Sequence, residues 1–215
     1  SVGLFLLLLA VPAVVVNNLW WHPDSLMFLF LALTLFFLDR DDQRFGRNFY
    51  LAAAACGVAT GIKHMGLFFA LAIPVYLLWG VLSKRVRWGR AVLAGLLFLL
   101  VMASALVLSN PLLLLPQERS EIIQVQKRLF SEASAGVVLV NQAAFFEHGW
   151  PEDVRIHYGE PWFVLLAFLA LLVGITRPET RRRSAWILAW ILPLTGVLLT
   201  FGTRRTHYFI PVMLP

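Results

Sequence analysis

The sequence predicts an all-α protein: a polytopic transmembrane bundle of about seven or eight spans. Hydrophobic residues make up 60% of its 215 positions and charged residues only 14%, whereas a typical soluble domain is about one quarter charged. Apolar runs recur along the chain, and residues 91–108 carry no charge at all. Because about 20 apolar residues cross a bilayer core as a helix, such runs indicate membrane spans.

Seven apolar segments are candidate spans. They cover residues 1–19, 25–38, 49–62, 65–82, 91–109, 161–176 and 185–202, and an eighth begins near Tyr208. Prolines 12, 74 and 193 exclude none of them, because neighbouring helices satisfy the carbonyl that a proline frees. We interpret residues 1–215 as a single transmembrane domain that we expect to be truncated at both ends, since the first and last residues lie in apolar runs.

Basic residues indicate which loops face the cytoplasm. Three alternate loops, 39–48, 83–90 and 177–184, hold eleven of them: Arg40, Arg44, Arg47, Lys84, Arg85, Arg87, Arg90, Arg177, Arg181, Arg182 and Arg183. Cytoplasmic loops of membrane proteins are enriched in Lys and Arg, so the loops at 20–24, 63–64 and 203–207 should face outside. This clustering explains the net charge of +6 better than a nucleic-acid groove does.

Residues 110–160 form a long polar segment on the predicted outer side. Within it, residues 120–130 alternate apolar and polar side chains with helical spacing. We expect an amphipathic helix there, lying along the membrane surface.

The junction at Trp21-His22-Pro23-Asp24 separates two apolar runs. Ionisable residues at such positions are functional candidates because they are costly to keep near a membrane. Asp24 could act as a general base, or it could cap the helix predicted from residue 25, since Asp is a favoured N-cap. Both roles remain open, and His22 is a candidate polar contact.

Two basic clusters share the predicted outer side with Asp24. Lys63-His64 interrupts apolar sequence, and it could either bind an anionic head group or reach out to water. Arg204-Arg205 precedes Tyr208; the arginines could grip phosphate oxygens or serve with the tyrosine as an interfacial anchor.

Acidic residues and histidines also gather in the outer segment, at Glu147-His148, Glu152-Asp153 and His157. Their types suit a divalent metal, but their spacing matches no known ligand pattern, so we name no metal residues and leave a divalent cofactor possible. Asp41-Asp42 is interpreted as a solvated turn. Glycine-rich nucleotide motifs and a serine nucleophile elbow are absent from the sequence.

Several motifs together resemble the C-type (GT-C) membrane glycosyltransferases, in particular glycosyltransferase family 39 with its protein O-mannosyltransferases and aminoarabinose transferases. These motifs are the outward Asp that opens a helix (His22-Pro23-Asp24-Ser25), the turn running from Gly57 to Lys63, Asn110-Pro111, and the segment from Arg205 through Tyr208 to Pro215. The usual tyrosine after Asn-Pro is replaced here by Leu112. The family's principal acidic residue has no counterpart, and we expect it upstream of Ser1.

The resemblance implies transfer of a hexosyl or pentosyl group from a polyprenyl-phosphate-linked sugar to a hydroxyl of a lipid, glycan or protein acceptor. Lys63, Arg204, Arg205 and Tyr208 would bind the donor phosphate, Asp24 would assist catalysis, and His22, His64 and His148 could supply polar contacts. It also implies a bacterial inner-membrane enzyme among membrane lipids, with its active site facing the periplasm. A transporter or flippase of an anionic lipid or solute is the main alternative, and a non-catalytic assembly subunit is another.

Overall fold

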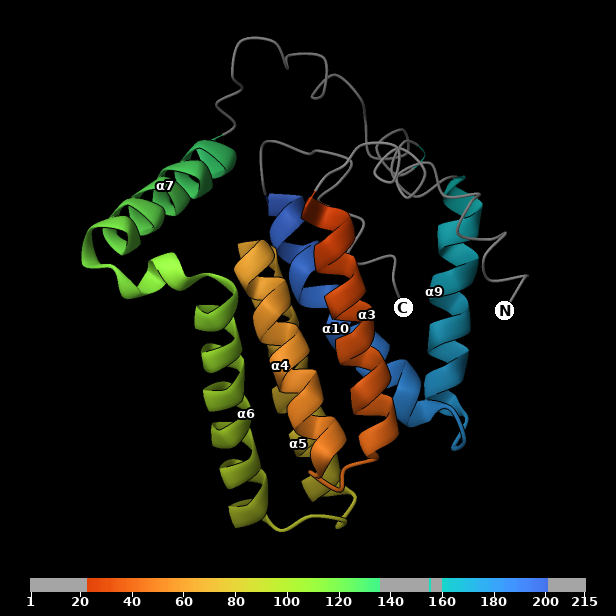
Figure 1. Ribbon diagram of the computed structural model, residues 1–215. Coiled ribbons are helices and arrows are strands. Elements are labelled where there is room, and N and C mark those ends of the chain that lie inside the picture. The colour runs from red at the N-terminus through yellow and green to blue at the C-terminus, as the bar shows by residue number, and fades with distance from the viewer. Residues whose placement is uncertain (1–22, 136–154, 156–159, 201–215) are drawn as a thin grey trace. The chain divides into compact units, whose positions relative to one another are not determined.

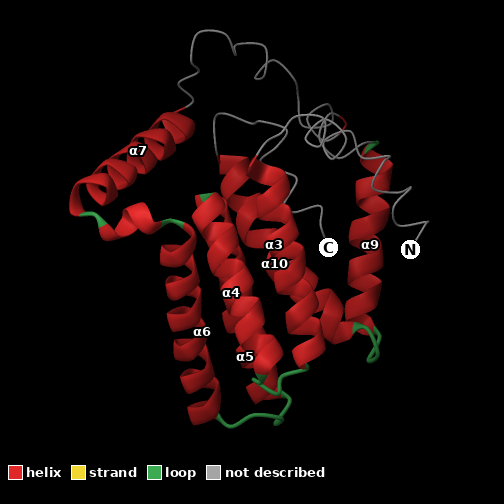
Figure 2. Ribbon diagram, viewed as in Figure 1, coloured by secondary structure: helices red, strands yellow, loops and turns green. Residues whose placement is uncertain are grey.

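The structure is a computed structural model that describes residues 23–135, 155 and 160–200, and every regular element in these residues is a helix (Figures 1 and 2). The all-α prediction is therefore confirmed for this part of the chain. The predicted spans at 1–19 and from Tyr208 lie outside the described residues. The chain divides into two compact units, residues 23–119 and the remainder, and each is described by itself.

The unit of residues 23–119 is a series of antiparallel helices (Figure 1). Its elements are α3 (Pro23–Asp41), α4 (Arg47–Ile62), the 3₁₀ helix η1 (His64–Leu71), α5 (Ala72–Leu82), α6 (Trp88–Ser109) and the short 3₁₀ helix η2 (Pro111–Leu114). They coincide with the predicted spans 25–38, 49–62, 65–82 and 91–109. The span predicted as one helix over 65–82 is instead a 3₁₀ segment followed by an α-helix that contains Pro74.

Helix α4 is the centre of this unit and packs against both α3 and α6. Its buried face consists mostly of small residues: Ala52, Ala53, Ala55, Cys56, Gly57 and Ala59. Small side chains let helix backbones approach closely, which is how membrane helices commonly associate. A Cβ added at Gly57 would collide with the carbonyl oxygen of Met102 on α6 and lie 2.9 Å from the Cβ of Ala105.

Aromatic side chains fill the core at the α3–α4 loop end of the same unit. The ring of Phe49 stacks on Tyr76 with centroids 6.0 Å apart and an interplanar angle of 20°, and it contacts Phe98 at 5.1 Å. Phe49 and Phe98 are fully buried. This cluster ties α4, α5 and α6 together, because the three rings come from these three helices.

In the other unit, α9 (Pro161–Thr176) and α10 (Arg181–Thr200) form an antiparallel hairpin. The turn is held by side chains that bind the last carbonyls of α9: the Thr180 hydroxyl donates to Gly174 O at 2.9 Å, and Arg181 Nε donates to Ile175 O at 2.9 Å. Satisfying these carbonyls ends α9 cleanly. Helix α10 runs through Pro193, as expected from the sequence.

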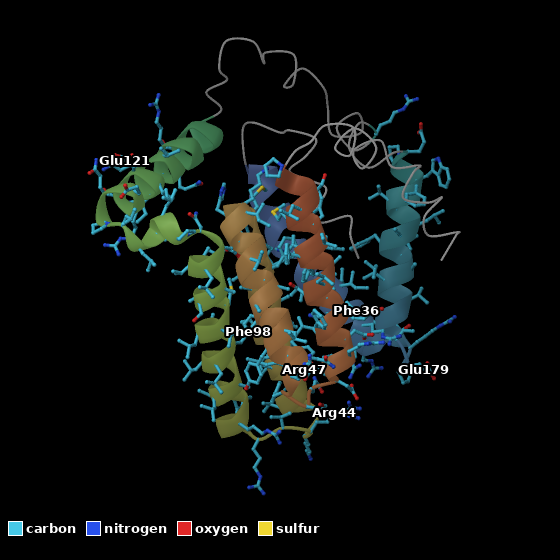
Figure 3. The ribbon with its side chains drawn as sticks, viewed as in Figure 1. Phe36, Arg44, Arg47, Phe98, Glu121 and Glu179 are labelled. Atoms are coloured by element: carbon cyan, nitrogen blue, oxygen red, sulfur yellow. The ribbon has the colours of Figure 1, made fainter. Side chains whose placement is uncertain are left out.

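Helix α7 (Pro116–Ala135) confirms the helix predicted over 120–130 and is longer at both ends. Exposed polar residues such as Glu121 (labelled in Figure 3) share this helix with exposed Ile123 and Val125. Its predicted position along the membrane surface stays a prediction.

Within the described ranges, two helical segments are long and apolar enough to cross a membrane, His64–Leu82 and Trp88–Ser109. A shorter apolar helix is Pro161–Thr176. These segments agree with the predicted membrane composition, while the full bundle of seven or eight spans stays a prediction.

Candidate functional site

Three of the predicted motifs lie at one end of the unit of residues 23–119: Asp24, the Gly57-to-Lys63 turn and Asn110-Pro111. Helix α3 begins at this end, α4 ends there at Ile62, and α6 ends there at Ser109 (Figure 1). A Cβ at Gly61 would collide with the Ser109 hydroxyl and lie 3.4 Å from Leu106 O. The close approach of Gly61 and Ser109 shows that the α4–η1 turn and the end of α6 are direct neighbours.

Lys63 is the residue at which the chain reverses between α4 and η1. Its backbone is extended (φ −152°, ψ 128°), its N–H donates to Ala59 O at 3.0 Å, and its carbonyl accepts from Gly66 N at 2.9 Å. The residue is half-buried, and its neighbour His64 is exposed. The turn therefore holds the Lys63 Cα in a fixed place.

Gly66 is what allows this turn to be so tight. A Cβ at residue 66 would lie 2.7 Å from Thr60 N and 2.8 Å from the carbonyl carbon of Ala59. The Cys56 thiol also points at the turn and donates to Gly66 O at 3.9 Å. The glycines of the Gly57-to-Lys63 motif and Gly66 thus have a packing role that places Lys63.

Asp24 lies in the first turn of α3, because the helix begins at Pro23 and not at residue 25. The expected position of Asp24 as the residue preceding the helix is therefore wrong: the helix begins two residues earlier than predicted, and Asp24 is its second residue. Proline is favoured at the first helical position, and a carboxylate in the first turn interacts favourably with the helix dipole. Asp24 begins its helix at the same end as the Lys63 turn; the position of its side chain is outside what the structure describes.

The interpretation of Asp41-Asp42 as a solvated turn is wrong for Asp41, which lies at the opposite end of the unit and is only 3% exposed. Its carboxylate accepts hydrogen bonds from Phe45 N at 3.1 Å, Gly46 N at 2.9 Å and the Tyr76 hydroxyl at 3.0 Å. The Tyr76 oxygen in turn accepts from Gln43 N at 2.6 Å.

This arrangement, which we call the Asp41 clamp (Asp41, Gln43 and Tyr76), holds a strained loop. Asp42, Gln43 and Phe45 have positive φ values of 48°, 63° and 55°, a conformation that is costly for residues other than glycine. The buried carboxylate stabilises it by binding the backbone N–H groups of Phe45, which is buried, and of Gly46, which is exposed. Sequence reasoning missed the clamp; the only local signal was an Asp four and five residues before Phe45 and Gly46.

Comparison with known proteins gives one match. The family model described as dolichyl-phosphate-mannose-protein mannosyltransferase matches residues 1–108, which is just over half of the chain. The chain belongs to this family. Searches of curated proteins and of solved structures find no match.

The resemblance stated from the sequence is thereby confirmed, and with it membership of a family of integral membrane glycosyltransferases. The family match includes Asp24, Lys63 and the glycines that shape the turn. It ends immediately before Ser109, so the motifs at Asn110-Pro111 and after Arg204 lie beyond it.

The remaining candidate residues of this mannosyltransferase-family protein fall outside the described residues. These are His22, His148, Arg204, Arg205 and Tyr208. Among residues 23–135, 155 and 160–200, no group of three His, Cys, Asp or Glu side chains could hold a metal ion. Glu147-His148, Glu152-Asp153 and His157 also lie outside that part of the chain.

Proposed function

We propose that this member of the mannosyltransferase family transfers a sugar from a polyprenyl-phosphate donor to an acceptor hydroxyl on the extracytoplasmic side of the membrane. The observation that carries the proposal is the Lys63 turn. It fixes a half-buried lysine at the end of the helix unit where α3 begins, with Asp24 in the first turn of that helix. Both residues lie within the family match.

In this proposal the donor phosphate binds the Lys63 ammonium, a compact cation suited to phosphate. As the bond from the anomeric carbon to the phosphate oxygen breaks, negative charge builds on the leaving phosphate, and a cation fixed beside it stabilises that charge. Arg204, Arg205 and Tyr208 would complete the phosphate site, and His22, His64 and His148 would supply polar contacts to the sugar or acceptor.

Asp24 assists in the proposal by orienting the acceptor hydroxyl or accepting its proton. The acceptor oxygen then attacks the anomeric carbon from the side opposite the phosphate, which inverts the configuration at that carbon.

The phosphate role of Lys63 is tested in the full-length protein, reconstituted in liposomes with radiolabelled polyprenyl-phosphate mannose and with an extract of the source cells as the supply of acceptor hydroxyls. Binding of the donor and release of polyprenyl phosphate are measured for Lys63→Ala, Lys63→Arg and, as a matched control, Lys84→Ala. Lys84 is an exposed lysine in the loop at the other end of the unit. A hydrogen bond to a charged group contributes about 1.5–3 kcal/mol, so Lys63→Ala should weaken donor binding roughly 10- to 150-fold.

Lys63→Arg should retain part of the affinity, and Lys84→Ala should behave as the wild type. Equal donor binding and turnover in Lys63→Ala and Lys84→Ala would overturn the phosphate role. Movement of intact donor to the other leaflet without release of polyprenyl phosphate would favour the flippase alternative over the transferase.

The proposed position of the Lys63 turn outside the membrane has a separate test, in which single cysteines are introduced at either end of the unit and labelled. Cys56 is fully buried, so it should react little with a membrane-impermeant maleimide. His64→Cys should be labelled in intact cells, whereas Lys84→Cys should be labelled only after the cells are opened. The reverse pattern would place the Lys63 turn in the cytoplasm and exclude an extracytoplasmic active site.

A further inference from the structure

The exposed basic residues at the Asp41 end of the unit of residues 23–119 form a surface of their own. Figure 3 shows Arg44 and Arg47 at this end. All the basic side chains here are exposed: Arg40, Arg44, Arg47, Lys84, Arg85, Arg87 and Arg90. Three acidic residues lie at the same end: Asp41 is buried in its clamp, Asp42 pairs with Arg85 at 3.4 Å, and Asp39 is half-buried in the last turn of α3. The seven exposed cations outnumber them.

Hydrogen bonds join the two loops that carry these cations into one fixed surface. Arg90 Nη2 donates to Arg44 O at 3.1 Å, which places Arg44 beside the first turn of α6. Gln43 Nε2 donates to Tyr76 O at 3.3 Å, so the loop of residues 42–46 is anchored to α5 as well. The cations are thus presented by a rigid scaffold and not by two independent loops.

The first turn of α6 adds an aromatic residue at the edge of this surface. Trp88 lies between Arg87 and Arg90 in sequence and is 62% exposed. Tryptophan is enriched where a membrane protein crosses from hydrocarbon to head groups. Its position here marks the boundary between a polar surface and an apolar one.

From Trp88 toward its C-terminus, α6 presents an apolar stripe on the side that does not face α4. Val92, Leu96, Leu99 and Leu100 are all more than half exposed and follow Trp88 at helical spacing, whereas Ala91, Ala94, Phe98 and Met102 are the buried residues of the same helix. The stripe begins one helical turn after Trp88, next in sequence to Arg87 and Arg90 at the start of α6.

We propose that this surface is a binding site for an anionic phospholipid of the bilayer, with the phosphate head group on Arg44, Arg87 and Arg90 and an acyl chain along the Trp88–Leu100 stripe of α6. Charge complementarity favours an anionic head group, and the adjoining stripe favours a molecule with a long apolar tail. Free phosphate would use only the first of these features, and an acidic protein segment would not need the second. The proposal is independent of the glycosyltransferase reaction.

The test uses native mass spectrometry of the full-length protein, titrated with phosphatidylglycerol and with phosphatidylcholine of the same acyl chains. Each basic residue near an anionic surface contributes about a fivefold factor in affinity, so Arg44→Gln combined with Arg87→Gln should weaken phosphatidylglycerol binding roughly 30-fold. Neither side chain is needed for the hydrogen bonds that hold the loops, because Arg44 acts there through its carbonyl and Arg87 through its backbone. Binding of phosphatidylcholine should change little.

Two matched variants complete the design. Arg44→Lys with Arg87→Lys keeps the charge and should restore most of the affinity, and Arg119→Gln with Lys127→Gln removes the same charge elsewhere and should leave it unchanged. Equal affinity for the two lipids in the wild type would overturn the proposal, as would an equal loss in both glutamine pairs, which would mean that net charge alone sets the preference. Displacement of the lipid by millimolar inorganic phosphate would also overturn it, because the acyl chain would then contribute nothing.

The position of the acyl chain is tested with a photo-reactive benzophenone side chain in place of Leu96. It should crosslink phosphatidylglycerol in preference to phosphatidylcholine, and this preference should disappear when Arg44 and Arg87 are both glutamine. A preference that survives the glutamine pair would separate the stripe from the cations and refute a single site.

Discussion

Replacing Gly66 by alanine tests the claim that this glycine sets the position of Lys63. The added Cβ would lie 2.7 Å from Thr60 N, 2.8 Å from Ala59 C and 3.0 Å from Ala59 O. All three are backbone atoms of α4, which cannot rotate out of the way as a side chain could. The turn must therefore open, and Lys63 must move with it.

The size of the effect follows from two opposing terms. Outside a crowded site, Gly→Ala in a helical segment stabilises by up to about 1 kcal/mol. Forcing an extra methyl group into a packed site costs about 1–3 kcal/mol. With the full helical gain subtracted, we expect Gly66→Ala to destabilise the protein by up to about 2 kcal/mol and to weaken polyprenyl-phosphate donor binding as well.

The assay is an SDS unfolding titration of the full-length protein in mixed micelles, with Gly89→Ala as the control. Gly89 is also helical, and a Cβ there would meet nothing within 4 Å, so its alanine variant should be neutral or stabilised. Equal stabilisation of both variants would refute the reasoning, because the crowding at residue 66 would then be absent. Unchanged donor binding in a destabilised Gly66→Ala would instead separate the turn from the phosphate role of Lys63.

Four further changes test the rest of the structure. Asp41→Ala should destabilise the protein by about 2–3 kcal/mol in the same titration, because the buried Phe45 N–H and Tyr76 hydroxyl lose their acceptor; a neutral variant would contradict the clamp. Tyr76→Phe keeps the ring stacked on Phe49 but removes the hydroxyl, so the expected cost is smaller, about 1–2 kcal/mol, and a cost as large as that of Asp41→Ala would contradict this division. Gly57→Ala should cost about 1–3 kcal/mol in the titration because its Cβ meets the α6 backbone, and stabilisation would argue against the close α4–α6 contact. Asp24→Asn should lower the rate of sugar transfer more than donor affinity in the liposome assay, whereas a loss of folded protein alone would show that Asp24 acts only at the helix start.

The helices were largely predictable because uninterrupted apolar runs are a strong signal, but their ends were not. Helix α3 extends to Asp41, beyond the predicted residue 38, and Asp41 is buried there because its carboxylate binds Phe45 N–H, Gly46 N–H and the Tyr76 hydroxyl. The run over 65–82 is continuous in hydropathy, yet it changes from 3₁₀ to α-helix near Pro74. Proline has no N–H to donate to the carbonyl four residues earlier, and hydropathy does not carry that information.

The candidate site was predictable only as far as the alternation of the spans fixes which end of the helical unit each residue occupies. Alternation of the spans puts residue 24, at the start of α3, and residue 63, after the end of α4, at the same end of the helical unit, and the structure has both segments there. The burial of Asp41 was not predictable in this way, because it depends on Tyr76, which is 35 residues away in sequence. From the sequence alone, an acidic residue beside arginines is expected to be solvated. Asp41 is buried because the Tyr76 hydroxyl and the backbone N–H groups of the following loop bind its carboxylate.

The Gly57-to-Lys63 motif combines two kinds of constraint that the structure separates. Gly57 and Gly61 are explained by helix packing, since a Cβ at either position would collide with α6. Lys63 is not explained in this way, because its extended backbone (φ −152°, ψ 128°) is open to any residue with a side chain. Helix packing therefore demands the glycines, whereas the backbone leaves the identity of residue 63 free. In the proposed function, the cation at this position is explained by the donor phosphate that it binds.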